Sequence, residues 1–113
     1  MNGFTLLEKL WERLQPQAKA NRFDGFDLEH PPKELILYKF DGCIFCQRVM
    51  LFIGQHKLPV VYRDVRENAA YQRELLAHTG RTQVPCLLID GKPMLESADI
   101  VAYLKQVFLK SNA

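Results

Sequence analysis

Two cysteines, three positions apart, are the residues of this chain whose type and spacing most clearly indicate chemistry. The sequence CIFC at positions 43–46 lies between an apolar run, 35–40, and a helix-like run, 47–56. A helix that begins at the first cysteine directs unpaired backbone N–H groups and the positive end of its dipole at that sulfur. Such settings lower a thiol pKa from about 8.5 to the range of about 3.5 to 7.5. We therefore expect Cys43 to be the nucleophilic thiolate and Cys46 to be a more buried resolving thiol.

Composition excludes several other classes of protein. The chain has 113 residues, 48% of them hydrophobic and 25% charged, which fits one small folded domain. Its net charge of +2 comes from 15 basic and 13 acidic residues without any block of like charges, so we expect no nucleic-acid partner. Three cysteines are too few, and odd in number, for the disulfide framework of a secreted domain. No signal-peptide pattern or transmembrane segment is evident, and we expect a reducing, cytoplasmic setting.

The elements that must position the two thiols begin after an N-terminal extension. Phe4, Leu7, Trp11 and Leu14 recur at helical spacing and predict an amphipathic helix that ends near Pro16. Residues 17–33 indicate a connecting arm, so we divide the chain into 1–33, the helix and arm, and 34–113, the compact domain. The apolar stripe of the helix is expected to dock on the domain or to mediate self-association, and shallow membrane binding is the less favoured alternative.

The compact domain reads as alternating strands and helices. We expect strands over 35–40, 60–65, 86–90 and 93–95. The expected helices are 47–56, a second one capped by Asn68 and closed by Gly80, and a final one capped by Ser97 and running through Phe108. Asp90-Gly91 predicts a hairpin turn. A parallel, right-handed β-α-β unit followed by an antiparallel hairpin gives an α/β fold, with a mixed sheet and helices on both faces.

Four motifs in this order make the chain resemble the glutaredoxin family, and in particular its branch close to the N-terminal domain of glutathione transferases. They are CIFC at 43–46, TGRTQVP at 79–85, Asp90-Gly91, and ESADI at 96–100. The resemblance implies a thioredoxin-like three-layer sandwich of order βαβαββα, here with an extra N-terminal amphipathic helix. It also implies a glutathione-dependent oxidoreductase that acts on disulfide-containing or glutathionylated proteins.

The resemblance further implies a glutathione site. A cis Val84–Pro85 bond would present the Val84 backbone to the peptide, although a trans proline that opens a strand is the plain alternative. Glu96 and Ser97 would hold the γ-glutamyl end, whereas Ser97 taken alone is an N-cap. The remaining implied contacts are Asp99 for the amino group, Phe45 as an aromatic wall, and Gln72, less surely Arg73, for the glycyl carboxylate, with a solvated helix face as the alternative for Gln72 and Arg73.

The chain departs from the family at several positions. Ile44 and Phe45 stand where glutaredoxins commonly have proline and tyrosine, and the missing proline makes a bridging [2Fe-2S] cluster conceivable, held by Cys43 and glutathione. The family's lysine is displaced to Lys39, with Phe40 at its usual place. Adjacent strand residues face opposite ways, which speaks against a role for Lys39 in the site.

The leading hypothesis is therefore a glutathione-disulfide oxidoreductase using Cys43 and Cys46, with [2Fe-2S] cluster binding or transfer as the alternative. Transferase activity is disfavoured because transferases that resemble this domain carry a long helical second domain. A zinc site is weaker still, because the two cysteines lack a second ligand pair. Cys86, within a buried-looking strand, is interpreted as a packing cysteine, with redox exchange with Cys43 as the alternative.

Overall fold

The computed structural model describes residues 23–109 of the chain. The amphipathic helix expected before Pro16 lies outside the described residues.

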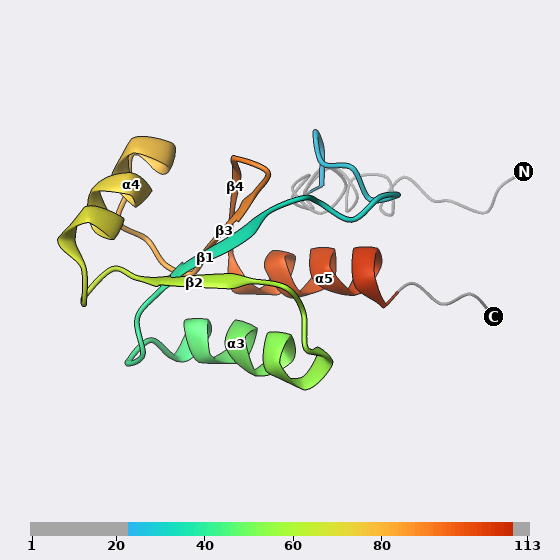
Figure 1. Cartoon of the computed structure of the whole chain (residues 1–113), viewed down its shortest axis with the longest axis horizontal. Helices are drawn as coiled ribbons and strands as arrows, with labels where there is room; N and C mark the ends of the chain where they lie inside the picture. The colour runs from blue at the N-terminus through green and yellow to red at the C-terminus, as the bar shows by residue number, and fades with distance from the viewer. Residues whose placement is uncertain (1–22, 110–113) are drawn as a thin grey trace, which may run out of the picture.

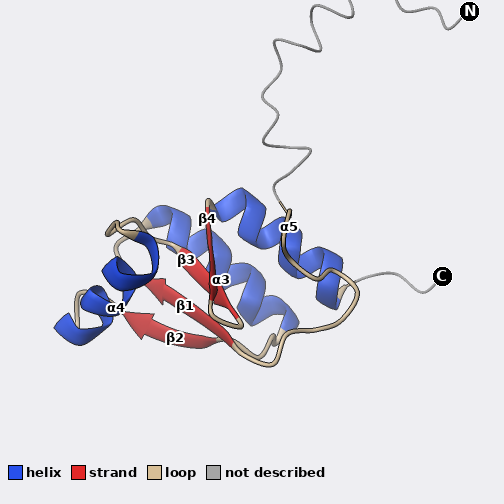
Figure 2. Ribbon diagram, turned by 90° about the horizontal axis from the view of Figure 1, so that it is seen from above, coloured by secondary structure: helices blue, strands red, loops and turns tan. Residues whose placement is uncertain are grey.

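A four-stranded mixed sheet forms the middle of the domain, with strand order β2-β1-β3-β4. β1 (Leu35–Lys39) pairs in parallel with β2 (Val61–Asp64) on one side and antiparallel with β3 (Cys86–Ile89) on the other. β4 (Lys92–Leu95) completes the sheet as the antiparallel partner of β3. Figure 2 shows the strands and their order. The expected parallel unit and antiparallel hairpin are both confirmed.

Helices cover both faces of this sheet. α3 (Ile44–His56) and α5 (Ser97–Phe108) lie side by side on one face, and α4 (Ala69–Thr79) lies on the other (Figure 1). The order of elements is β1-α3-β2-α4-β3-β4-α5. This is the expected three-layer, thioredoxin-like α/β sandwich.

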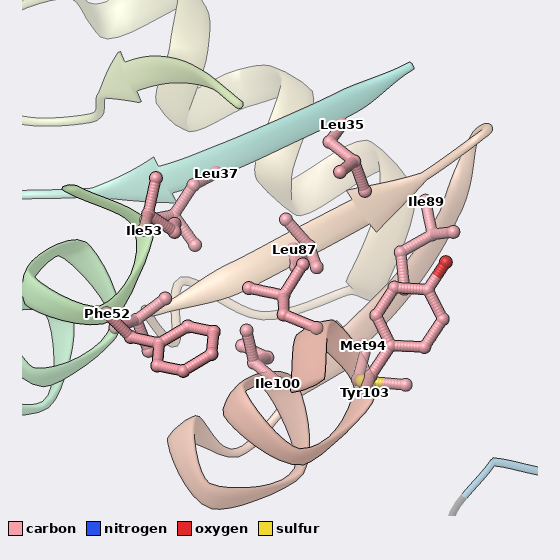
Figure 3. Close-up of a cluster of buried hydrophobic side chains, with 11 residues drawn as sticks. Leu35, Leu37, Phe52, Ile53, Leu87, Ile89, Met94, Ile100 and Tyr103 are labelled. Atoms are coloured by element: carbon pink, nitrogen blue, oxygen red, sulfur yellow. The ribbon is translucent and has the colours of Figure 1, made fainter. Parts of the chain in front are cut away.

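The alternation of side chains along β1 divides the core into two clusters. Leu35 and Leu37 pack toward α3 and α5, whereas Ile36 and Tyr38 pack toward α4. Figure 3 shows the first cluster, in which the ring of Tyr103 from α5 packs against the sheet. The whole of β3 is buried, because it is a central strand with helices on both sides.

Local sequence chemistry fixes most element boundaries. The Asn68 side chain accepts a hydrogen bond from the N–H of Ala70, and Gly80 ends α4 in the left-handed conformation at φ 74°, both as expected. Asp90 and Gly91 form the turn between β3 and β4 with φ of 48° and 89°, the signs that a type I′ hairpin turn requires.

The expected cap of the last helix is wrong by one residue. α5 begins at Ser97, and its N-cap is Glu96, which makes no side-chain capping bond. Sequence preference favours serine as a cap, but the N-cap is Glu96 with φ 74°, so the helix starts one position earlier than serine chemistry alone indicates.

The described part of the connecting arm packs against the domain. The rings of Phe23 and Phe26 lie 6.4 and 6.1 Å from that of Tyr103, measured between ring centroids. The Lys92 ammonium donates to the Gly25 carbonyl at 2.8 Å. These contacts join residues 23–26 to α5 and to the β3–β4 hairpin.

Candidate active site

Cys43 is the N-cap residue of α3. Its backbone is extended, at φ −89° and ψ 118°, and its sulfur accepts a hydrogen bond from the N–H of Cys46 at 3.3 Å. The Cys43 N–H donates to the carbonyl of Phe40 at 3.2 Å, which holds the loop after β1 against the start of the helix. A negative charge on this sulfur therefore meets an amide N–H at the positive end of a helix dipole.

Cys46 lies one turn further along α3 and is fully buried, whereas Cys43 is partly exposed. Burial, with a smaller contribution from the hydrogen bond to Cys43, raises the pKa of Cys46 to about 12, although the backbone of Phe40 opposes the shift. Both sulfurs are free thiols. The expected difference in exposure between the two thiols is confirmed.

A hollow of about 280 Å³ lies beside the Cys43-Cys46 turn. It is lined by Phe45 from α3, by the segment 83–85 before β3, and by Glu96 and Ser97 at the start of α5. The Val84–Pro85 bond in its wall is cis, as the resemblance implied. The hollow thus brings together residues from three separate parts of the sequence, and most of the expected glutathione-binding set is among them.

The wall formed by Glu96 is held by a chain of polar contacts. Gln83 donates from Nε2 to the Glu96 carboxylate at 3.3 Å, and Arg81 donates to Gln83 Oε1 at 3.1 Å. Glu96 itself has a positive φ, a conformation that costs free energy in a non-glycine residue and is frequent at functional sites. Ser97 is only 8% exposed and lies at the N-terminal end of α5, where the helix dipole favours an anion.

Two of the expected residues do not line the hollow. Gln72 is exposed on α4, and Asp99 is partly buried in the first turn of α5. Gln83, in contrast, lines the hollow but was not singled out in the sequence. Its position directly before Val84-Pro85 was the signal that could have identified it.

An apolar surface borders the first hollow on the side of α3. Ile44, Phe45 and Leu51 are 72%, 55% and 64% exposed, and with Gln47 and Arg48 they line an open depression of about 520 Å³. Phe45 belongs to both hollows. Exposed apolar side chains therefore extend from the Cys43-Cys46 turn along α3.

Cys86 lies apart from this chemistry. It is fully buried among Ile36, Tyr38 and Leu75, and burial raises its pKa to about 11. These properties favour the interpretation of Cys86 as a packing residue.

Lys39 lines neither of the two hollows. Lys39 follows Leu35 and Leu37 on the α3 side of the sheet, and its positive charge opposes the rise in the Cys46 pKa, whose largest cause is burial. Adjacent strand residues face opposite ways, so Lys39 and Phe40 lie on opposite faces of the sheet, as expected. The face that carries Lys39 is the one that packs against α3, the helix that contains Cys46.

Within residues 23–109, no group of three or more His, Cys, Asp or Glu side chains is arranged to hold a metal ion. The [2Fe-2S] alternative therefore finds no support in this part of the chain. None of the helices in the same residues is long and apolar enough to cross a membrane.

The fold and the paired thiols define a thioredoxin-like domain with a cysteine at a helix N-terminus. Residues 37–110 match the model of the family described as glutathione S-transferase, N-terminal domain, and the chain belongs to this family.

Individual proteins agree with this assignment. The chain is 29% identical over 110 residues to prostaglandin E synthase 2 of Danio rerio, covering 97% of this chain and 28% of that protein. Its structure resembles an epsilon-class glutathione S-transferase from the housefly Musca domestica, with a TM-score of 0.60, 28% identity, and coverage of 70% of this chain and 37% of that one. It also resembles glutaredoxin 2 from Salmonella typhimurium in complex with glutathione, with a TM-score of 0.55, 27% identity, and coverage of 63% and 32%. The chain spans 28% of the length of the curated relative it matches.

Proposed function

We propose that this chain is a glutathione-dependent thiol-disulfide oxidoreductase of the glutaredoxin type, with Cys43 as the nucleophile. The observation that carries the proposal is the Cys43 sulfur at the N-terminus of α3, which accepts the N–H of Cys46 next to the hollow of about 280 Å³ that Phe45 lines. An exposed sulfur stabilised by amide dipoles is suited both to attack a disulfide and to leave from one. A reducing compartment such as the cytoplasm suits this chemistry, since it supplies glutathione.

The reaction exchanges disulfides without a further cofactor. The Cys43 thiolate attacks the glutathione sulfur of a glutathionylated protein, the protein thiolate leaves with the electron pair and takes up a proton, and Cys43 becomes a mixed disulfide with glutathione. A second glutathione then releases oxidised glutathione, or Cys46 attacks Cys43 and releases reduced glutathione. The buried, weakly acidic Cys46 favours the first of these two routes.

Glutathione is proposed to occupy the hollow lined by Phe45, Val84, Pro85, Glu96 and Ser97. The N-terminus of α5 suits the γ-glutamyl carboxylate, because free N–H groups and the helix dipole both favour an anion. The bound glutathione of the Salmonella relative supports the assignment. Asp99 and Gln72 are kept as candidate contacts to the amino group and the glycyl carboxylate, with less support because neither lines the hollow.

Two cysteine variants test the proposal. Cys43→Ser should abolish reduction of a glutathionylated peptide, whereas Cys46→Ser should retain appreciable activity because external glutathione completes the cycle. Equal loss in both variants would favour a dithiol route and defeat the glutathione assignment. Both variants are compared by coupled reduction of the oxidised glutathione that the reaction releases.

A second pair of variants tests the hollow. Ser97→Ala together with Glu96→Gln should raise the KM for glutathione and leave alkylation of Cys43 unchanged. Gln55→Ala, an exposed residue near the far end of α3, is the matched control and should leave both unchanged. An unchanged KM in the paired variant would remove glutathione from this hollow.

A further inference from the structure

The end of β1 carries a lysine whose ammonium group is almost enclosed. The side chain of Lys39 is 12% exposed, and its Nζ lies 2.7 Å from Asp41 and 3.4 Å from Asp64. It also lies 5.7 Å from the centroid of the Tyr62 ring. A charge held by two carboxylates from a loop and a neighbouring strand has a fixed position.

Lys39 and Cys46 reach the same region from opposite sides. Lys39 lies at the end of the face of β1 that packs against α3. Cys46 is the first residue of the buried stripe of α3 that continues through Val49 and Ile53. The backbone of Phe40, the residue next to Lys39, is among the groups that lower the pKa of Cys46. The enclosed ammonium group and the buried thiol therefore lie at the same end of the α3–β1 interface.

Cys46 needs stabilisation of negative charge if it is to act. Burial raises the pKa of Cys46 to about 12, and the charge of Lys39 is one of the influences that oppose this rise. Both carboxylates that hold Lys39 are partly compensated: Asp41 is 77% exposed, so solvent screens its charge, and Asp64 also accepts the N–H groups of Arg66 and Glu67.

We propose that Lys39 is a positioning residue for the resolving step, in which its fixed ammonium group stabilises the charge that develops on Cys46 as this sulfur attacks Cys43. The inference rests on the proposed function, because it concerns the second half of the same exchange. In this step the bond between Cys43 and a bound thiol breaks and a Cys43–Cys46 disulfide forms. The bound thiol leaves as a thiolate with the electron pair and takes up a proton, and the Cys46 proton passes to solvent.

The test isolates the resolving step from glutathione recognition. Cys43 is loaded with one equivalent of a chromogenic aromatic disulfide, 5,5′-dithiobis(2-nitrobenzoate), and release of the second coloured thiolate reports closure by Cys46. Removing the Lys39 charge should raise the pKa of Cys46 further, and the smaller thiolate population is only partly offset by higher nucleophilicity, so Lys39→Met should slow release about threefold or more. The rate of loading at Cys43 should stay within about twofold of wild type, on the same scale.

Lys39→Arg should restore most of the release rate, because it keeps a fixed charge that carboxylates can hold. Lys105→Met, which removes an exposed lysine on α5, is the matched control and should release at the wild-type rate. In Lys39→Met, the alkaline rise of the release rate should also move to higher pH, which a purely structural role would not produce.

Equal release rates in Lys39→Met and wild type would overturn the inference, as would an arginine variant as slow as the methionine variant. Because loading is chemical, a chain that never accepts glutathione still gives a release rate. Failure of glutathionylation with normal closure would count against the proposed function alone.

Discussion

Limited alkylation of the native protein should separate the three thiols by rate. At about pH 8 an ordinary thiol, with a pKa of about 8.5, is roughly one-quarter thiolate. The pKa values of about 12 and about 11 leave roughly one Cys46 thiol in ten thousand and one Cys86 thiol in a thousand ionised under the same condition. Ionisation alone thus slows Cys46 roughly 2,500-fold and Cys86 roughly 250-fold relative to an ordinary thiol.

A more basic thiolate is a stronger nucleophile, which offsets part of this difference in alkylation rate. With a Brønsted coefficient of about 0.4 to 0.5, the gain in nucleophilicity is roughly 40-fold for Cys46 and 13-fold for Cys86. The net expectation is alkylation roughly 60-fold slower at Cys46 and 20-fold slower at Cys86, before burial excludes the reagent further.

The assay is a brief pulse of iodoacetamide, followed by quenching and mass spectrometry of the intact chain and of its peptides. One carbamidomethyl group at Cys43 should appear first, and the denatured chain should accept three, one for each cysteine. Rates at the three sulfurs within about fivefold of one another would refute the reasoning, because neither ionisation nor burial would then distinguish them.

Three further variants test the scaffold. Tyr38→Phe removes the hydrogen bond of 2.9 Å to Glu74 and should cost about 1 kcal/mol, since the carboxylate is more than one-third exposed; an unchanged urea midpoint would contradict this. Ile100→Ala, at a fully buried site between α5 and the sheet, should cost about 3 kcal/mol by the same measurement, and a loss below about 1 kcal/mol would show that the core collapses around it. Burial raises the pKa of Asp64, but hydrogen bonds from two backbone N–H groups and from Lys39 bring the pKa below the ordinary 3.8. The ionised carboxylate therefore stabilises the fold above pH 3.8, and this stabilisation is lost as the pH falls through the lower pKa of the folded state. The difference in stability between wild type and Asp64→Asn should therefore be full near neutral pH and vanish in acid, and a difference that grows in acid would be the wrong sign.

The fold was predictable because its signals are local. Asn68 and Gly80 delimit α4 through a side-chain acceptor and a left-handed backbone, both of which depend on residue type alone. The apolar runs of β1 and β3 and the turn at Asp90-Gly91 likewise predicted these two strands and the β3–β4 hairpin. The spacing of Cys43 and Cys46 was enough to place one sulfur at a helix N-terminus and the other inside.

Only the tertiary structure determined which side chains meet. The bond between Gln83 and Glu96 joins residues 13 positions apart across the hollow, and no local preference indicates it. The N-cap of α5 is Glu96 and not the predicted Ser97, because the surrounding chain holds Glu96 at a positive φ that the residue itself disfavours. Lys39 was placed outside the site by the alternation of strand residues, yet this alternation turns it toward the helix that carries Cys46. Sequence thus determined the elements and the reacting sulfurs, whereas contacts between distant segments determined the groups that surround them, because those contacts depend on how the elements pack.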